Sequence, residues 1–227
     1  GVFVWDVEGK KYYDFLSAYS SVNQGHCHPR IVNAMIEQAQ TLTLTSRAFH
    51  NDKLGPYEEY VTNYFGFDKV LPMNTGAEAV ETAMKLARKW GYEKKGIHAN
   101  QAKIIVCQNN FHGRTMAVIS ASVDPDARAE YGPYLPGLEI IDYNDLDALR
   151  NALKDPNVAG FIVEPIQGEA GVVVPDANYL PDAAKMCRDN KVLLIADEVQ
   201  TGIARTGKLL AVCGDCTCSK SWLFARI

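Results

Sequence analysis

Residues 158–163 read VAGFIV and residues 192–196 read VLLIA, separated by EPIQGEAGVVVPDANYLPDAAKMCRDNK at residues 164–191. Both apolar runs are continuous, which is typical of strands whose two faces are covered by helices. Between them, residues 179–189 have the spacing of an amphipathic helix. The stretch therefore predicts a strand, a helix and a second parallel strand, the unit from which α/β sheets are built.

The same alternation extends toward the N-terminus. We expect strands at residues 70–73, 103–107 and 138–141, and helices at residues 77–90, 115–120 and 146–153. Upstream of these, the sequence predicts a hairpin of residues 3–5 and 11–15 with Gly9 in its turn, a helix that begins at Pro29, and another over residues 56–65. The predicted fold class is α/β, with a mostly parallel sheet and helices on both faces.

The composition excludes several classes of protein. Hydrophobic residues make up 47% and charged residues 22% of the 227 residues, which argues against disordered, collagen-like and coiled-coil chains. The formal net charge is −4 and no cluster of Lys and Arg occurs, so we expect no nucleic-acid partner. The longest apolar runs are far shorter than the ~20 residues that span a bilayer, so we expect no membrane span.

The ends and the cysteines give weaker signals. The chain begins Gly-Val-Phe-Val-Trp, without an initiator Met or a targeting segment, and we expect that it starts inside a longer or processed chain. Cys27, Cys107 and Cys187 stand singly and are interpreted as reduced thiols. The tail at residues 213–227 carries Cys213, Cys216 and Cys218. A structural zinc site normally takes four ligands, and the tail offers too few, so no metal site is predicted.

Polar residues follow the predicted strands, at residues 74–77, 110–114, 164–169 and 197–200. Ligands of parallel sheets bind outside the carboxyl ends of the strands, so these four loops form the candidate site. Thr75, Gly76 and Ala77 open a helix, whose N–H groups and dipole can hold a phosphate. An ordinary helix cap with a turn glycine is the alternative interpretation of these residues.

Three further side chains suggest chemistry in these loops. Asp197 directly follows a buried strand, where an acid requires a cationic partner, a metal ion or a hydrogen-bonded proton. Phe111 offers an aromatic face, and Arg114 offers the fork geometry that binds carboxylates. Core packing or a surface ion pair is the alternative for each of the last two residues.

Residues 202–208, GIARTGK, match the first seven positions of a phosphate-binding P-loop. However, Leu209 replaces the Ser or Thr that binds Mg²⁺, and Gly214 interrupts the helix that the motif requires. A P-loop nucleotide site is therefore not predicted.

Five segments carry a resemblance to a known family: SAYSSVNQGHCHP (residues 17–29), LPMNTGAEAVETA (71–83), FHGRT (111–115), VEPIQGEAGV (163–172) and IADEVQTG (195–202). In this order they resemble the class-III aminotransferases, which use pyridoxal 5'-phosphate (PLP), and most of all the ornithine-specific branch. The resemblance covers residues 1 to about 212. It implies an N-terminal segment at residues 1–50, the large PLP-binding domain of a fold-type I transferase at 51–212, incomplete at the C-terminus, and a tail at 213–227 outside the family pattern.

The resemblance also implies roles for individual residues. Thr75, Gly76 and Ala77 would hold the PLP phosphate, Phe111 would stack on the pyridine ring, Asp197 would pair with the ring nitrogen, and Gln200 would lie near the phenolic oxygen. Tyr19, Arg114 and Glu169 would contact the substrate. The implied reaction transfers the δ-amino group of ornithine to 2-oxoglutarate and gives glutamate 5-semialdehyde and glutamate.

A homodimer is implied for the full-length protein, in the mitochondrial matrix of a eukaryote or otherwise in the cytoplasm. An acetylornithine-type or 4-aminobutyrate-type enzyme and a non-catalytic truncated subunit are the alternatives. The family pattern continues beyond Val212 with a strand, a lysine that binds PLP covalently and a C-terminal domain. Lys220 has no strand before it, and Arg226 stands where that lysine is expected, although a guanidinium is too weak a nucleophile. We therefore expect a chain that lacks its Schiff-base lysine and is inactive alone.

Overall fold

The computed structural model describes residues 1–46, 48–213 and 222–225. The chain divides into two compact units, Gly1–Leu71 and Pro72–Ile227, which are described separately below. The three segments that the family resemblance implies, residues 1–50, 51–212 and 213–227, stay a prediction. Cys216, Cys218, Lys220 and Arg226 lie outside the described residues.

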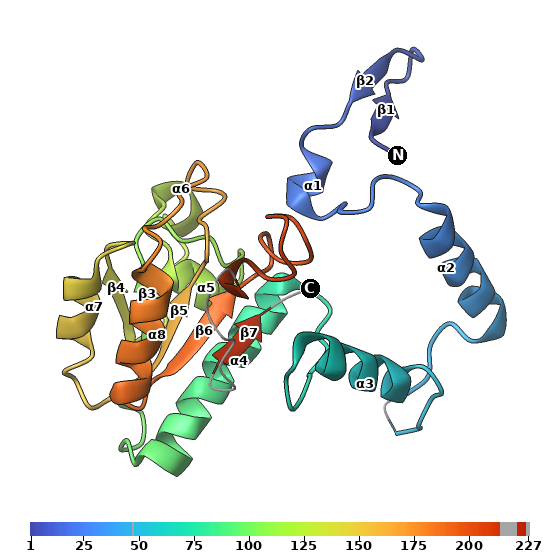
Figure 1. Cartoon of the computed structure of the whole chain (residues 1–227). Coiled ribbons are helices and arrows are strands. Elements are labelled where there is room, and N and C mark those ends of the chain that lie inside the picture. The colour runs from blue at the N-terminus through green and yellow to red at the C-terminus, as the bar shows by residue number, and fades with distance from the viewer. Residues whose placement is uncertain (47, 214–221, 226–227) are drawn as a thin grey trace. The chain divides into compact units, whose positions relative to one another are not determined.

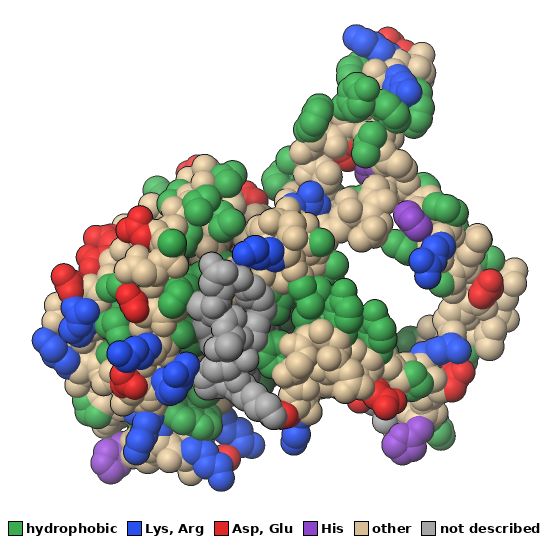
Figure 2. Space-filling view, viewed as in Figure 1, with side chains coloured by type: hydrophobic (Ala, Val, Ile, Leu, Met, Phe, Trp, Pro, Cys, Tyr) green, Lys and Arg blue, Asp and Glu red, His purple; other side chains and the backbone are tan. Residues whose placement is uncertain are grey.

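The first unit begins with the expected hairpin. Strands β1 (Phe3–Trp5) and β2 (Lys11–Tyr13) pair antiparallel, and Gly9 in the connecting turn has a φ of +83°. The helices α2 (Pro29–Thr41) and α3 (Leu54–Phe65) follow, and neither buries any of its residues. Hydrophobic side chains are accordingly visible on the surface of this unit (Figure 2).

A left-handed turn separates the hairpin from these helices. All four residues of α1 (Ser17–Ser20) have positive φ, a conformation that costs roughly 1–2 kcal/mol for each residue with a Cβ atom. Oδ1 of Asp14 accepts hydrogen bonds from the N–H groups of Leu16 (3.0 Å) and Ser17 (2.9 Å), where the turn begins. Tyr19, a predicted substrate contact, lies in this turn and is exposed.

The second unit is built on a parallel five-stranded sheet, as the sequence predicts (Figure 1). Its strands are β3 (Lys103–Cys107), β4 (Leu138–Ile141), β5 (Val158–Val163), β6 (Leu193–Asp197) and β7 (Trp222–Ala225), in the spatial order β4-β3-β5-β6-β7. The α-helices are α4 (Gly76–Trp90), α5 (Met116–Ala121), α6 (Pro125–Arg128), α7 (Leu146–Ala152) and α8 (Tyr179–Asp189). A π-helix, η1 (Gly91–Lys95), continues α4, and η2 (Ala211–Cys213) is a short 3-10 helix.

Both faces of the sheet are covered. Ile104 and Val106 of β3 pack in one cluster with residues of α4 and α5, including Met84 and Val118. The alternate residue Cys107 points the other way, and its Sγ lies 3.8 Å from the hydroxyl of Tyr179 in α8. All six residues of β5 are buried, which confirms the inference drawn from its continuous apolar run.

Two expectations about strands were wrong. Residues 70–73 form no strand, and Pro72 in this segment has no N–H group for a ladder hydrogen bond. Conversely, β7 lies in the tail, where no strand was expected, and pairs parallel with β6 in the register Leu194 to Trp222. Family resemblance stops before this segment, and its four residues are too short a run for a periodic signal.

The surface of the second unit carries charged side chains of both signs, in line with the small net charge of the sequence. Lys and Arg side chains are interspersed with Asp and Glu side chains on the face of the second unit shown in Figure 2. Within the described residues, no helix is both long and apolar enough to cross a bilayer, and no group of three or more His, Cys, Asp or Glu residues could hold a metal ion.

Candidate functional site

A cavity of about 200 Å³ lies within the second unit at the carboxyl ends of the strands. The loops after β3, β5 and β6 and the first residues of α4 line it. Strands β3 and β5 are neighbours, but the chain leaves β3 toward β4 on one side and leaves β5 toward β6 on the other. Such a reversal opens a crevice between the two loops, which is where ligands of parallel sheets bind.

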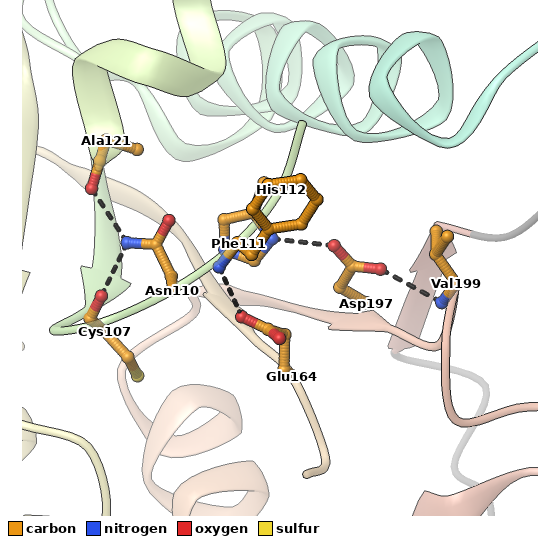
Figure 3. Close-up of polar contacts among 8 residues, drawn as sticks. All are labelled: Cys107, Asn110, Phe111, His112, Ala121, Glu164, Asp197 and Val199. Carbon is orange, nitrogen blue, oxygen red and sulfur yellow. Dashed lines mark hydrogen bonds and ion pairs between the residues drawn. The ribbon is translucent and has the colours of Figure 1, made fainter. Parts of the chain in front are cut away.

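Asp197, the last residue of β6, forms a buried pair with His112 from the loop after β3 (Figure 3). Nδ1 of His112 lies 2.7 Å from Oδ2 of Asp197, and the two side chains are 1% and 4% exposed. The other carboxylate oxygen accepts a hydrogen bond from the N–H group of Val199 at 3.1 Å. The carboxylate is therefore held from two sides.

The pair changes the acid–base behaviour of His112. Burial disfavours the charged imidazolium, but the hydrogen bond and the negative charge of Asp197 outweigh burial and raise the pKa of His112. Its second ring nitrogen, Nε2, is buried and has no hydrogen-bond partner among the described residues. Buried polar atoms without a partner are uncommon, and they gather at sites that bind ligands or water.

Glu164, which follows β5, lies beside this pair. Its Oε1 accepts a hydrogen bond from the N–H group of Phe111 at 2.8 Å, and its side chain lines the cavity (Figure 3). Burial raises the pKa of Glu164 to about 7, although the positive charge of His112 and the hydrogen bond from Phe111 act in the opposite direction. A carboxyl group in this cavity therefore changes its charge near neutral pH.

The loop that carries Phe111 and His112 is anchored at both ends. Nδ2 of Asn110 donates hydrogen bonds to the carbonyl oxygens of Cys107 (2.6 Å) and Ala121 (2.8 Å). Gly113, with a φ of +121°, brings the loop so close to α4 that a Cβ atom would lie 2.7 Å from Cβ of Ala77. Only glycine allows this approach of the loop to the start of the helix.

The start of α4 forms another wall of the cavity. Thr75 is the N-cap, and its side-chain oxygen accepts a hydrogen bond from the N–H group of Glu78 at 3.2 Å. The N–H groups of Gly76 and Ala77 have no acceptor within the helix, and both residues line the cavity. This is the arrangement that binds anions at helix N-termini.

The structure brings together five of the predicted site residues around the cavity: Gly76, Ala77, Phe111, Asp197 and Gln200. Thr75 caps the adjacent helix and does not itself line the cavity. Glu169 does not line the cavity either, but its Oε1 accepts a hydrogen bond at 2.6 Å from Nε2 of Gln200, which does.

The remaining two predicted residues lie elsewhere. The guanidinium carbon of Arg114 lies 5.8 Å from the centre of the Phe111 ring, and its side chain is exposed. Tyr19 belongs to the first unit, so its contact with a substrate at this cavity stays a prediction.

Sequence reasoning missed His112 and Glu164 as site residues. Glu164 carries the signal that identified Asp197, because it directly follows a continuous apolar strand. His112 has no such signal: a single histidine beside Phe111 becomes notable only when the fold places Asp197 next to it. Residues 202–208, which resemble a P-loop in sequence, belong to a segment that folds back on itself: the N–H group of Ile203 donates to the carbonyl oxygen of Leu209, and that of Ala204 donates to the carbonyl oxygen of Lys208.

Comparisons with known proteins agree on one family. The class-III aminotransferase model matches residues 1–216. The mitochondrial ornithine aminotransferase of Drosophila ananassae is 67% identical over 212 residues, which are 93% of this chain and 49% of that protein. The chain thus spans about half the length of the curated relatives it matches.

Solved structures give the same result. The ornithine aminotransferase of Toxoplasma gondii superimposes with a TM-score of 0.93 at 56% identity, over 94% of this chain and 51% of that one. The acetylornithine aminotransferase of Elizabethkingia anophelis superimposes with a TM-score of 0.80 at 60% identity, over 93% and 49%. The sheet and its helices therefore have the architecture of these enzymes.

Proposed function

Because the chain belongs to the class-III aminotransferase family, we propose that it forms the cofactor-binding part of an ornithine aminotransferase that uses PLP. The reaction would transfer the δ-amino group of ornithine to 2-oxoglutarate and give glutamate 5-semialdehyde and glutamate. High identity to ornithine aminotransferases from several organisms supports this substrate.

The buried His112–Asp197 pair in the cavity carries the proposal. Burying a carboxylate at the end of a strand costs free energy unless a cationic group partners it. His112 is one such partner of Asp197, and the protonated pyridine nitrogen of PLP would be a second. The residues around the pair fit the rest of PLP. An aromatic side chain, Phe111, lies on one wall, and the N-terminus of α4 on another suits a phosphate group.

When bound, PLP would supply an electron-accepting ring that stabilises negative charge at the reacting carbon of the amino donor. In this proposal Asp197 keeps the ring nitrogen protonated, and His112 holds Asp197 in the orientation that this requires. Gly76 and Ala77 would bind the phosphate through their backbone N–H groups. Phe111 would stack on the ring.

Gln200 and Glu169 would act together in the substrate half of the site. Their side chains are joined by a hydrogen bond of 2.6 Å. In this arrangement Gln200 would contact the phenolic oxygen of PLP, and Glu169 would contact the substrate. We further propose that Arg114 binds a substrate carboxylate and that Tyr19 contacts ornithine.

The proposal extends to assembly and location. We propose a homodimer, as the family resemblance implies, and a mitochondrial protein, in line with the mitochondrial relatives from Drosophila and rat. N-acetylornithine is the second candidate donor, because an acetylornithine aminotransferase matches the chain at 60% identity.

A donor comparison tests the function directly. The longest product that the gene encodes would be assayed with ornithine, N-acetylornithine and 4-aminobutyrate at equal concentration, with 2-oxoglutarate as acceptor. We expect ornithine to give the highest kcat/KM and glutamate 5-semialdehyde as product. A much higher kcat/KM with either other donor would show that the ornithine assignment is wrong.

A further inference from the structure

Glu164 is a buried carboxyl group to which the proposed cofactor contacts give no role. It is 7% exposed and lines the cavity. It directly follows strand β5, and Asp197 is the last residue of the neighbouring strand β6. Its backbone is fixed independently of its side chain. The hydroxyl of Tyr143 donates to the carbonyl oxygens of Glu164 (3.0 Å) and Pro165 (3.1 Å).

The side chain of Glu164 in turn fixes the loop after β3. Its Oε1 accepts a hydrogen bond from the N–H group of Phe111 at 2.8 Å (Figure 3). The two residues are 53 positions apart in the sequence. A bond to the backbone at this residue sets the direction in which the Phe111 ring leaves the loop. The ring forms part of the cavity wall, so its position depends on Glu164.

The carboxyl group of Glu164 also acts on its neighbours through its charge. The titratable groups that interact with it electrostatically come from strand ends and loops around it: His112, Asp197, Glu169, Tyr143 and Cys107. His112 alone among these five is positively charged when protonated. Negative charge on Glu164 therefore adds to that of Asp197 and favours the imidazolium form of His112.

We propose that Glu164 is a positioning residue of the cofactor site, which fixes the ring of Phe111 through the backbone and stabilises protonated His112 beside Asp197. The effect on ring stacking rests on the proposed function. The effects on Phe111 and His112 themselves do not, and both are measurable without cofactor.

Two substitutions separate the two effects. Glu164→Gln keeps an oxygen that can accept the Phe111 N–H group but removes the charge. Glu164→Asp keeps the charge but shortens the side chain by one methylene group, so that it no longer reaches Phe111. Glu93→Gln is the matched control, because it removes one carboxylate from an exposed pair with Lys89 far from the cavity.

The first measurement uses NMR of the unliganded full chain between pH 5 and 9. We expect Glu164→Gln to move the titration midpoint of the His112 ring to lower pH and to abolish the pH-dependent shift of the Phe111 amide. Glu164→Asp should change the Phe111 amide at every pH. A His112 midpoint that is the same in Glu164→Gln as in the Glu93→Gln control would overturn the charge effect.

The second measurement is the affinity for pyridoxamine 5'-phosphate, which binds without a covalent bond. Glu164→Asp should weaken binding about tenfold, the loss expected for one hydrogen bond, and Glu164→Gln should restore most of it. Equal affinity of Glu164→Asp and the unaltered chain would overturn the positioning effect. If Asp197→Asn also leaves the affinity unchanged, the proposed function fails, and the NMR shifts alone decide the role of Glu164.

Discussion

Nδ1 of His112 lies 2.7 Å from Oδ2 of Asp197, in a cavity where both side chains are almost completely buried. The two residues are 85 positions apart in the sequence, one in a loop and the other at the end of a strand. Their contact joins the loop after β3 to the end of β6. An ionised carboxylate at this depth is stable only because the imidazole partners it.

Replacing His112 should therefore destabilise the fold. We expect His112→Phe to lower the free energy of unfolding by about 3 kcal/mol at pH 7, because it leaves the Asp197 carboxylate buried without its partner. His112→Asn keeps a side-chain donor near the position of Nδ1, and we expect a smaller loss. Urea unfolding curves measure both. Equal stability of His112→Phe and the unaltered chain would show that the pair does not stabilise the fold.

The His112 contribution should depend on pH. Its pKa is raised in the folded chain above the ordinary value of 6.5, because the bond and charge of Asp197 outweigh burial. The stabilisation is therefore complete below about pH 6.5 and is lost as the pH rises through the folded pKa. Unfolding curves of the unaltered chain and His112→Asn between pH 5.5 and 9 should converge as the pH rises. A constant difference would contradict the raised pKa.

Glu164 should also make the stability depend on pH. Burial raises its pKa from 4.5 to about 7, so the folded chain holds a proton that the unfolded chain releases. Stability conferred by that proton is complete below pH 4.5 and is lost by about pH 7, a change of about 3 kcal/mol. Glu164→Gln cannot lose a proton, so its stability relative to the unaltered chain should rise by that amount between pH 4.5 and 8. Denaturant unfolding at the two pH values measures this difference in stability. If it did not rise with pH, the raised pKa of Glu164 would be wrong.

Gly113→Ala tests the close approach of the Phe111 loop to α4. The added Cβ atom would lie 2.7 Å from Cβ of Ala77 at a φ of +121°, so we expect a loss of at least about 2 kcal/mol. Gly171→Ala is the matched control, since Gly171 has a φ of +105° but no atom within 4 Å. The control isolates the cost of positive φ. The same loss in both variants would show that contact with α4 is unimportant.

Thiol reactivity tests the core around α8. Burial raises the pKa of Cys107 and that of Cys187 to about 12, whereas Cys27 is exposed. Iodoacetamide at pH 8 should therefore alkylate Cys27 at least about a hundredfold faster than either buried thiol. Peptide mapping at successive times measures the rates. Comparable labelling of all three in the folded chain would contradict the packing of this core.

Much of the fold is readable in the sequence, and the reasons are local. The continuous apolar run of Val158–Val163 indicates a strand that is buried on both faces. The amphipathic spacing of α8 indicates a helix that is buried on one face only. The helix expected at residues 146–153 is α7, and Asp145 caps it by accepting hydrogen bonds from the N–H groups of Asp147 and Ala148. The strand expected at residues 70–73 was wrong, because its apolar residues suggested pairing that Pro72 disfavours.

The site is only partly readable in the same way. Asp197 is notable because a charged residue ends an apolar strand, and Gly76 because a glycine opens a helix. The contacts that organise the site depend on the tertiary fold. Phe111 bonds to Glu164 and His112 to Asp197 only because the strand order places β3 and β6 on either side of β5.

The affinity of the chain for pyridoxamine 5'-phosphate, with and without the Asp197 carboxylate, tests the central claim most directly. We expect the unaltered chain to bind it and Asp197→Asn to lose about 2–4 kcal/mol of binding free energy, a fall of roughly 30- to 1,000-fold. Asp147→Asn, which neutralises an exposed carboxylate, should bind normally. Equal affinity of the Asp197→Asn variant and the unaltered chain would contradict the assignment of this cavity as the cofactor site.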